Sequence, residues 1–237
     1  MKILSIDTSS KVCSVAALED TDIIIEKHLD NELTHSQKLM PMVDGLLKAC
    51  KLSLKDFDLF ACSTGPGSFT GVRIGVATVK AFNDVTNIPI SSVSSLEGLA
   101  YNTLDSNFSN KTNLVCSMID AKNDNVYYGM FEKKNENFEK VEELNVKNIN
   151  DMIEAFINYH NTPILFVGDG AEKHQYSLTK FFRKATFVED KYNVQTAISI
   201  GKAAFFKYKE GFYGDSNSIV PLYLRKSQAE RVLDGEE

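Results

Sequence analysis

The chain opens with Lys2-Ile3-Leu4-Ser5-Ile6-Asp7-Thr8-Ser9-Ser10, an apolar run that ends at an acidic residue and a polar turn. Residues 2–6 predict a β-strand, and residues 12–18 and 23–29 predict two more. Short apolar runs separated by Asp, Ser and Thr are typical of strands joined by tight turns. The start of the chain therefore predicts a three-stranded antiparallel meander.

The same pattern returns near the middle of the chain. Residues 114–119 form a second apolar run, and Asp120 ends it as Asp7 ends the first. A polar turn over residues 122–125 then leads to a predicted strand over 126–131. The repeat indicates that the chain is a duplication of one unit.

Helices and strands alternate after each meander, which is typical of an α/β fold with helices covering a mixed sheet. The predicted helices lie near residues 35–50, 70–83, 149–159 and 196–209, with others after Ser94 and Gly170, and the predicted strands cover 59–63, 90–93 and 164–167. The duplicated meander and helices predict the actin-like (ASKHA, duplicated ribonuclease-H-like) fold of two lobes. The Ser- and Asn-rich stretch 105–110 favours a break, so we predict an N-terminal lobe over residues 1–105 and a C-terminal lobe over 106–237.

Composition limits the classes of function. The net charge is −6 and the basic residues are scattered, which argues against a large nucleic-acid surface. The N-terminus reaches Asp7 before a signal-peptide core could form, and no apolar run approaches the length of a membrane span, so we expect a cytoplasmic protein with no membrane contact. The four cysteines lack the spacing of a metal or redox site: Cys13, Cys50, Cys62 and Cys116.

Two predicted helices carry more apolar surface than one sheet can cover. The helix over 35–50, which a Thr34-His35-Ser36-Gln37 capping box would open, is apolar over about half of its circumference, and the helix over 70–83 over about 220°. Either the two helices cover each other inside the monomer, or they form a docking patch, which is the interpretation we favour. The predicted contact residues are His35, Leu39, Met42, Val43, Leu46, Gly71, Val72, Arg73, Gly75, Val76, Val79 and Lys80.

Further expectations concern single positions in the second of these helices. Gly71 and Gly75 weaken the helix, and we expect them to allow another backbone to approach closely. A charge introduced by Val76→Glu should break association and leave the monomer folded.

The glycine-rich loop before this helix does not match a nucleotide-binding motif. Gly71 is followed by Val72-Arg73 and not by the Lys-Ser/Thr of a phosphate loop, and the glycine spacing is wrong for a dinucleotide fingerprint. Pro66 also has no amide proton to offer a phosphate. The loop therefore predicts a structural turn.

The segment Gly65-Pro66-Gly67-Ser68-Phe69-Thr70-Gly71-Val72-Arg73-Ile74-Gly75 closely resembles the corresponding segment of the TsaB (YeaZ) family. The similarity spans nearly the whole chain and includes residues 3–9, His35-Ser36-Gln37, Ile119-Asp120-Ala121, Val126-Tyr127, residues 167–171 and Pro221-Leu222-Tyr223-Leu224-Arg225. One departure is the turn Lys122-Asn123-Asp124-Asn125, where the family more often has an Arg and a Glu.

The resemblance implies an actin-like fold with a degenerate nucleotide site. It implies a non-catalytic scaffold that forms homodimers alone and heterodimers with the paralogous enzyme TsaD through the two apolar helices. TsaD-type enzymes transfer threonylcarbamoyl to the N6 of the adenosine beside the tRNA anticodon, a modification called t6A, and a TsaE-like ATPase joins the assembly. The chain itself would contact tRNA only through this complex.

Catalytic alternatives rest on few residues. His35 is followed four residues later by Leu39, so the helix lacks a metal-binding histidine pair, and we predict neither a metal site nor catalytic residues. Asp7-Thr8-Ser9 resembles the first phosphate turn of actin-like ATPases, and the stretch with Gly168 and Gly170 resembles a degenerate adenosine motif. We expect no cofactor, but residual ATP or ADP binding at these five positions stays open. The alternative function is an actin-like ATP-binding enzyme with its own weak ATPase or transferase activity.

Overall fold

In the computed structural model, which describes residues 1–30, 35–105 and 112–226, the first half of the chain builds a five-stranded mixed sheet. Its strands are β1 (Lys2–Asp7), β2 (Val12–Glu19), β3 (Asp22–Asp30), β4 (Leu59–Ser63) and β5 (Ile90–Val93), in the spatial order β3-β2-β1-β4-β5. The first three strands pair antiparallel, and β4 and β5 add in parallel beyond β1. The predicted meander is confirmed.

The second half repeats this topology strand for strand. Its strands are β6 (Leu114–Asp120), β7 (Asn125–Lys134), β8 (Asn137–Asn148), β9 (Ile164–Val167) and β10 (Ala185–Phe187), in the order β10-β9-β6-β7-β8. Asp7 and Asp120 each end the central strand of their sheet. The duplication and the predicted fold class are therefore confirmed, although β8 and β10 were not predicted.

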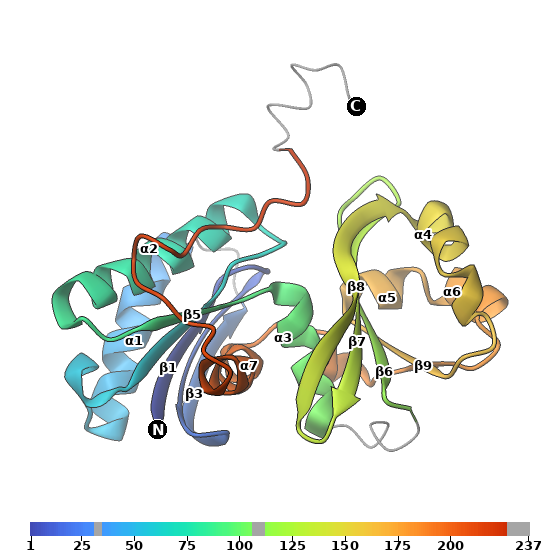
Figure 1. The fold of residues 1–237 in the computed structure, drawn as a ribbon. Helices are drawn as coiled ribbons and strands as arrows, with labels where there is room; N and C mark the ends of the chain where they lie inside the picture. Colours follow the sequence, from blue (N-terminus) through green and yellow to red (C-terminus); the bar gives the residue numbers. More distant parts are fainter. Residues whose placement is uncertain (31–34, 106–111, 227–237) are drawn as a thin grey trace.

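Most helices cover the outer faces of the two sheets (Figure 1). The first sheet carries α1 (His35–Cys50) and α2 (Phe69–Thr86), and the second carries α4 (Ile149–Ala155), α5 (Asp169–Lys173) and α6 (Gln175–Phe181). Short 3₁₀ turns lie at Leu54–Asp56, Thr103–Asp105, Ile157–Tyr159 and Asp190–Tyr192. The predicted cap at Thr34 and most of the predicted break over 105–110 lie outside the described residues.

The two remaining helices, α3 (Ser95–Asn102) and α7 (Ala197–Lys209), are exchanged between the halves. Helix α7 belongs to the second half but packs on β1, β2, β4 and β5, whereas α3 belongs to the first half but packs on β6, β7 and β8. The two helices also pack on each other between the sheets (Figure 1). The predicted lobe boundary between residues 105 and 106 stays a prediction. In the structure, the sheet of each half has one face covered by a helix from the other half.

A single apolar core fills the space between the sheets. It joins Ile3 and Leu18 of the first sheet to Val115 and Leu165 of the second through Ile200 of α7. Two further clusters lie under the outer helices. Within the described ranges, no helix is both long enough and apolar enough to cross a bilayer.

After α7 the chain runs back over the first sheet as a C-terminal segment (residues 212–226). Gly214 pairs with Ile90 at the free edge of β5, with backbone hydrogen bonds of 2.9 and 2.8 Å. Further along, the Leu222 amide donates to the Thr64 carbonyl at 2.7 Å. This segment therefore closes the edge of the first sheet and reaches the loop before α2.

Candidate functional site

The turn after β1 is buried. Asp7, Thr8 and Ser9 are each at most 1% exposed. The Oδ1 atom of Asp7 accepts a hydrogen bond from the Ser9 amide at 2.7 Å, while Oδ2 has no partner among the described residues. Burial raises the pKa of Asp7 from 3.8 to about 6, although the hydrogen bonds from Ser9 and the proximity of His35 act in the opposite direction. The carboxylate therefore lies inside the protein and not at its surface.

The glycine loop and the start of α2 lie directly on this turn. The Ser68 amide donates to the Ser9 carbonyl at 2.7 Å, and a Cβ atom on Gly67 would come within 2.2 Å of that same carbonyl oxygen. The Thr8 hydroxyl donates to the Gly71 carbonyl at 2.7 Å, and a Cβ atom on Gly71 would lie 2.0 Å from the Thr8 carbonyl. The close backbone approach predicted for Gly71 is confirmed. Protein atoms thus cover the turn that resembles a phosphate-binding turn.

The equivalent turn after β6 is held by an ion-pair cluster. The Asp120 carboxylate lies 3.1 Å from the Lys122 ammonium and 3.0 Å from that of Lys173. Partial burial alone would raise the pKa of Asp120, but hydrogen bonds from Lys173 and Lys122 outweigh it and lower the pKa. Lys122, Asn123 and Asp124 all have left-handed backbones, with φ of 65°, 50° and 55°. The turn therefore adopts a conformation that usually favours glycine without containing one.

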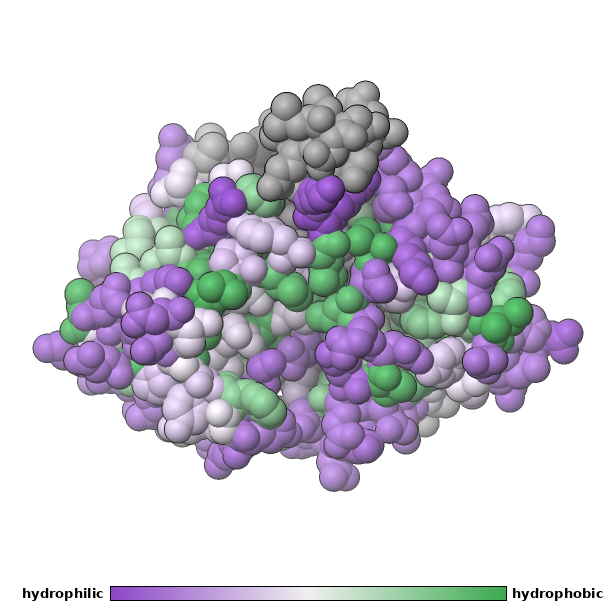
Figure 2. Space-filling model, turned by 45° about the horizontal axis from the view of Figure 1, so that its top comes forward, coloured by the Kyte–Doolittle hydropathy of each residue, from purple (hydrophilic) through white to green (hydrophobic). Residues whose placement is uncertain are grey.

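A cleft of about 520 Å³ lies between the two turns. Of the five nucleotide candidates only Ser9 lines it, together with Lys11, Ser68, Lys122, Asp169 and Gln195. Figure 2, which turns the top of the molecule forward, shows apolar residues gathered near the middle of this face and polar residues around its rim. The cleft is thus bordered by both turns but does not open onto Asp7.

Gly168 and Gly170 have packing roles. A Cβ atom on Gly168 would lie 2.1 Å from the Met118 carbonyl oxygen, and one on Gly170 would lie 2.9 Å from the Ile119 carbonyl carbon. The Gly168 amide also donates to the Asn193 side chain at 2.7 Å. These glycines let α5 start directly against β6, so neither needs a ligand to explain it.

Across the described part of the chain, no three His, Cys, Asp or Glu side chains come together as a metal site would require. The ring of His35 lies instead at the start of α1, where Nε2 is 2.8 Å from the Ser10 carbonyl. His35 therefore links α1 to the turn after β1.

The predicted docking patch needs correction at eight of its twelve positions. These side chains, or the glycine positions, are buried in the chain's own structure, because α1 lies over β2 and β3 while α2 lies over β1 and β4. They are Leu39, Val43, Leu46, Gly71, Val72, Gly75, Val76 and Val79. Val76 is only 4% exposed, so a charge at this position would disturb the monomer itself, contrary to our expectation from the sequence.

The surface that α2 does present is displaced by one residue from the predicted one. Phe69, Arg73, Ala77, Ala81 and Val85 are all exposed and are spaced by four along the helix, and we call them the exposed row of α2. Of the twelve predicted residues only Arg73 belongs to this row. Three others are half-buried: His35, Met42 and Lys80.

Comparisons with known proteins agree along almost the whole chain. A family model described as "TsaD: tRNA N6-adenosine threonylcarbamoyltransferase" matches residues 31–232. The "tRNA threonylcarbamoyladenosine biosynthesis protein TsaB" of Bacillus subtilis (strain 168) is 33% identical over 230 residues, covering 97% of this chain and 96% of its own length. The chain belongs to the TsaB family. The protein of the same name from Escherichia coli (strain K12) is 34% identical over 133 residues, 56% of each chain.

Solved structures support the fold of this TsaB-family chain. A structure titled "YeaZ from Pseudomonas aeruginosa" superposes with a TM-score of 0.75 at 23% identity, covering 94% of this chain and 99% of the other. The ROK hexokinase of Thermus thermophilus superposes with a TM-score of 0.54 at 8% identity, covering 89% and 100%. At these identities the likeness concerns the fold alone, which is the actin-like fold predicted from the sequence.

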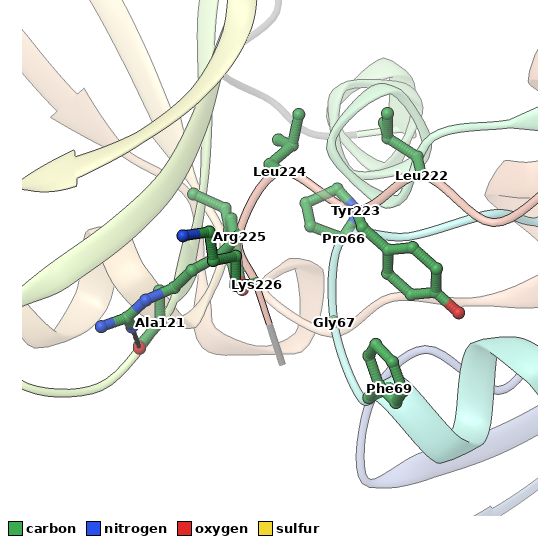
Figure 3. A pocket seen from close by; sticks show the side chains of 10 residues that line it. Pro66, Gly67, Phe69, Ala121, Leu222, Tyr223, Leu224, Arg225 and Lys226 are labelled. Atoms are coloured by element: carbon green, nitrogen blue, oxygen red, sulfur yellow. Dashed lines mark hydrogen bonds between the residues drawn. The ribbon is translucent and has the colours of Figure 1, made fainter. Parts of the chain in front are cut away.

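One stretch of TsaB resemblance had no assigned role in the sequence, namely Pro221-Leu222-Tyr223-Leu224-Arg225. The structure places it across the two halves. Leu222 pairs with Thr64 at the start of the glycine loop, and Nη1 of Arg225 donates to the Ala121 carbonyl at 2.7 Å (Figure 3). The stretch therefore connects the loop before α2 with the turn after β6.

Proposed function

We propose that this TsaB-family chain is a non-catalytic subunit in the biosynthesis of t6A. It docks onto a TsaD-type enzyme and supports transfer of threonylcarbamoyl to the N6 of the adenosine next to the tRNA anticodon. A TsaE-like ATPase joins this assembly, and tRNA is reached through the complex and not by this chain alone. In the absence of the enzyme, the chain pairs with a second copy of itself.

The observation that carries the docking proposal is the exposed row of α2. Its centre, Ala77 and Ala81, is small and apolar, so the backbone of a partner helix can approach closely. Phe69 is 36% exposed at one end of the row and Val85 is 71% exposed at the other. Exposed apolar side chains gathered along one side of a helix whose other side is buried are typical of a protein–protein contact.

The first of the two turns is covered by protein atoms, and this supports a non-catalytic role. Ser68 and Gly71 contact the residues of the first turn directly, and the Asp120 carboxylate of the second turn is neutralised by Lys122 and Lys173. A kinase of this fold class would need both turns open toward a nucleotide. The fold can therefore support docking without a catalytic step of its own.

Docking can be tested with one variant and one matched control. Ala77→Glu places a charge at the centre of the exposed row, and Ala155→Glu places the same charge on an exposed alanine of α4 in the other half. We expect Ala77→Glu to abolish co-purification with the TsaD-type enzyme of the same organism, and with it t6A formation in a mixture containing tRNA and the TsaE-type ATPase. Ala155→Glu should behave like the wild type. Equal binding by both variants would contradict the proposed surface.

A second candidate, an actin-like ATP-binding enzyme, is favoured by the cleft of about 520 Å³ beside Lys122 and Asp169. Calorimetric titration of ATP with Mg²⁺ into the pure chain separates the two candidates. The docking subunit should show no saturable heat and no hydrolysis. Saturable binding with hydrolysis that Asp7→Ala abolishes would instead support the enzyme.

A further inference from the structure

Arg73 is held in one position by two aromatic rings from distant parts of the chain. Its guanidinium carbon lies 3.9 Å from the centre of the Phe69 ring, and its Nε donates to the Tyr223 hydroxyl at 2.7 Å. The Phe69 and Tyr223 rings stack on each other with centres 4.7 Å apart (Figure 3). Phe69 is one turn before Arg73 on α2, while Tyr223 comes from the C-terminal segment. The side chain of Arg73 is therefore ordered before any partner arrives.

This arrangement leaves the end of the guanidinium available. The contact to Tyr223 uses Nε, and no hydrogen bond within the described residues uses either terminal nitrogen. No carboxylate among these residues lies within 4.0 Å of Arg73. Arg73 is exposed, so its two terminal nitrogens, each with one N–H bond directed outward, offer a pair of parallel donors at the surface. Such a pair matches the two oxygens of one carboxylate.

We propose that Tyr223 is a positioning residue that holds Arg73 to receive an Asp or Glu carboxylate of the partner enzyme. The inference rests on the proposed docking function and assigns a contact within it. An arginine whose rotamer is fixed in advance loses less side-chain freedom on binding, and the two aromatic rings supply that fixation. The 221–225 stretch thereby acquires a role in association as well as in closing the fold.

The surroundings favour a protein carboxylate over a nucleic-acid phosphate. Arg73 lies next to Ala77 and Ala81 on the exposed row of α2, and these two small apolar residues form a surface on which a helix of a partner protein can pack. Arg225, which lines a small pocket together with Phe69 and Tyr223, donates to the Ala121 carbonyl (Figure 3). Phosphate backbones are bound by clusters of cations, and the chain carries a net charge of −6.

The test measures the affinity of the full-length chain for the TsaD-type enzyme by calorimetry. Arg73→Ala should weaken binding about 30-fold, as expected when an arginine anchor is removed from an interface. Arg73→Lys should not restore it, because an ammonium lacks the paired donors. Tyr223→Phe, which removes one hydroxyl and keeps the ring, should weaken binding about 3- to 10-fold. In the Arg73→Ala background, Tyr223→Phe should have no further effect.

Two matched controls lie in the second half, on surfaces outside the row. Arg183→Ala and Tyr176→Phe alter an exposed arginine and an exposed tyrosine and should leave affinity unchanged. Melting temperatures close to that of the wild type would show that all variants are folded. A purely structural Tyr223 would weaken binding equally with and without Arg73.

Each outcome decides between the two proposals. If the wild type binds and both Arg73→Ala and Tyr223→Phe bind equally well, the carboxylate contact is overturned while the docking function stands. If the wild type does not bind the enzyme, both are overturned. Unchanged affinity for the enzyme together with weaker tRNA binding by the assembled complex would overturn the carboxylate in favour of a phosphate.

Discussion

The carboxylate of Glu97 in α3 lies 3.3 Å from the ammonium of Lys207 in α7, so an ion pair joins the two helices that the halves exchange. Both side chains are partly buried, at 18% and 27% exposure. Burial raises the pKa of Glu97, although Lys207 acts to lower it. The pair therefore lies between α3 and α7, where a lone charge would be costly.

Lys207→Met should destabilise the fold by about 1–3 kcal/mol, because it leaves Glu97 partly buried without its counter-ion. The double variant Glu97→Gln/Lys207→Met should regain part of this loss. Urea unfolding followed by circular dichroism measures both, and Lys209→Met on the exposed side of α7 is the matched control. A single variant as stable as its control would show that the pair contributes nothing.

Gly71→Ala and Gly45→Ala make the same change in neighbouring helices and should act in opposite directions. A Cβ atom on Gly71 meets the Thr8 backbone at 2.0 Å, so α2 must move and the fold should lose about 2 kcal/mol or more. A Cβ atom on Gly45 meets only the flexible end of Lys27, so the gain in helix propensity of about 0.5–1 kcal/mol should prevail. Thermal unfolding of both variants checks the pair. Equal changes would contradict the close approach at Thr8.

Asp7→Asn should change how stability depends on pH. Because burial raises the pKa of Asp7 from 3.8 to about 6, the folded chain binds more protons than the unfolded chain between these values. The wild type should therefore lose stability as pH rises from about 4 through 6, and the variant should be more stable by about 1–3 kcal/mol at pH 8.

Urea unfolding at pH 4.5, 6 and 8 measures this difference. Asp84→Asn, at an exposed position of α2, is the control and should follow the wild type at every pH. Parallel stability profiles for Asp7→Asn and the wild type would show that Asp7 does not ionise within this range.

Val76→Glu and Ala77→Glu should separate folding from association at adjacent positions. Val76 is 4% exposed and packs against the first sheet. A glutamate there would be an unpaired buried charge, so it should lower the free energy of unfolding by about 3–5 kcal/mol or unfold the monomer. Ala77 is exposed, so its variant should keep the wild-type circular dichroism and lose only association. Sedimentation and thermal unfolding of both variants together decide the matter.

Most of the fold could be predicted from the sequence because its apolar runs are short and well separated. Both central strands end in Ile-Asp, and this repeat, together with the helices and strands that follow each copy, indicated two equivalent sheets. Strand β8 was missed because it lies at an edge of its sheet and mixes Glu, Lys and Asn with exposed apolar residues such as Val141. Edge strands carry such charges because they discourage pairing with other chains. Its place beside β7 could have been inferred from the duplication, since β3 stands in the same position.

Less of the candidate docking surface could be predicted from the sequence. An apolar arc of about 220° indicates that α2 is buried on a broad side, but it does not tell which edge stays outside. Alanine counts as apolar in such an arc, so Ala81 gave no sign that it faces solvent. The contact of Tyr223 with Arg73 joins residues 150 positions apart, and no local pattern can report it.

The exchange of α3 and α7 also bears on how this chain could have arisen and on how it can be divided. A break near residue 105 would release two pieces, and each would hold the helix that the other needs to shield its sheet from water. Such pieces would have to find each other before either was stable. Because each half supplies a helix to the sheet of the other half, deleting either half would expose one face of the remaining sheet to water.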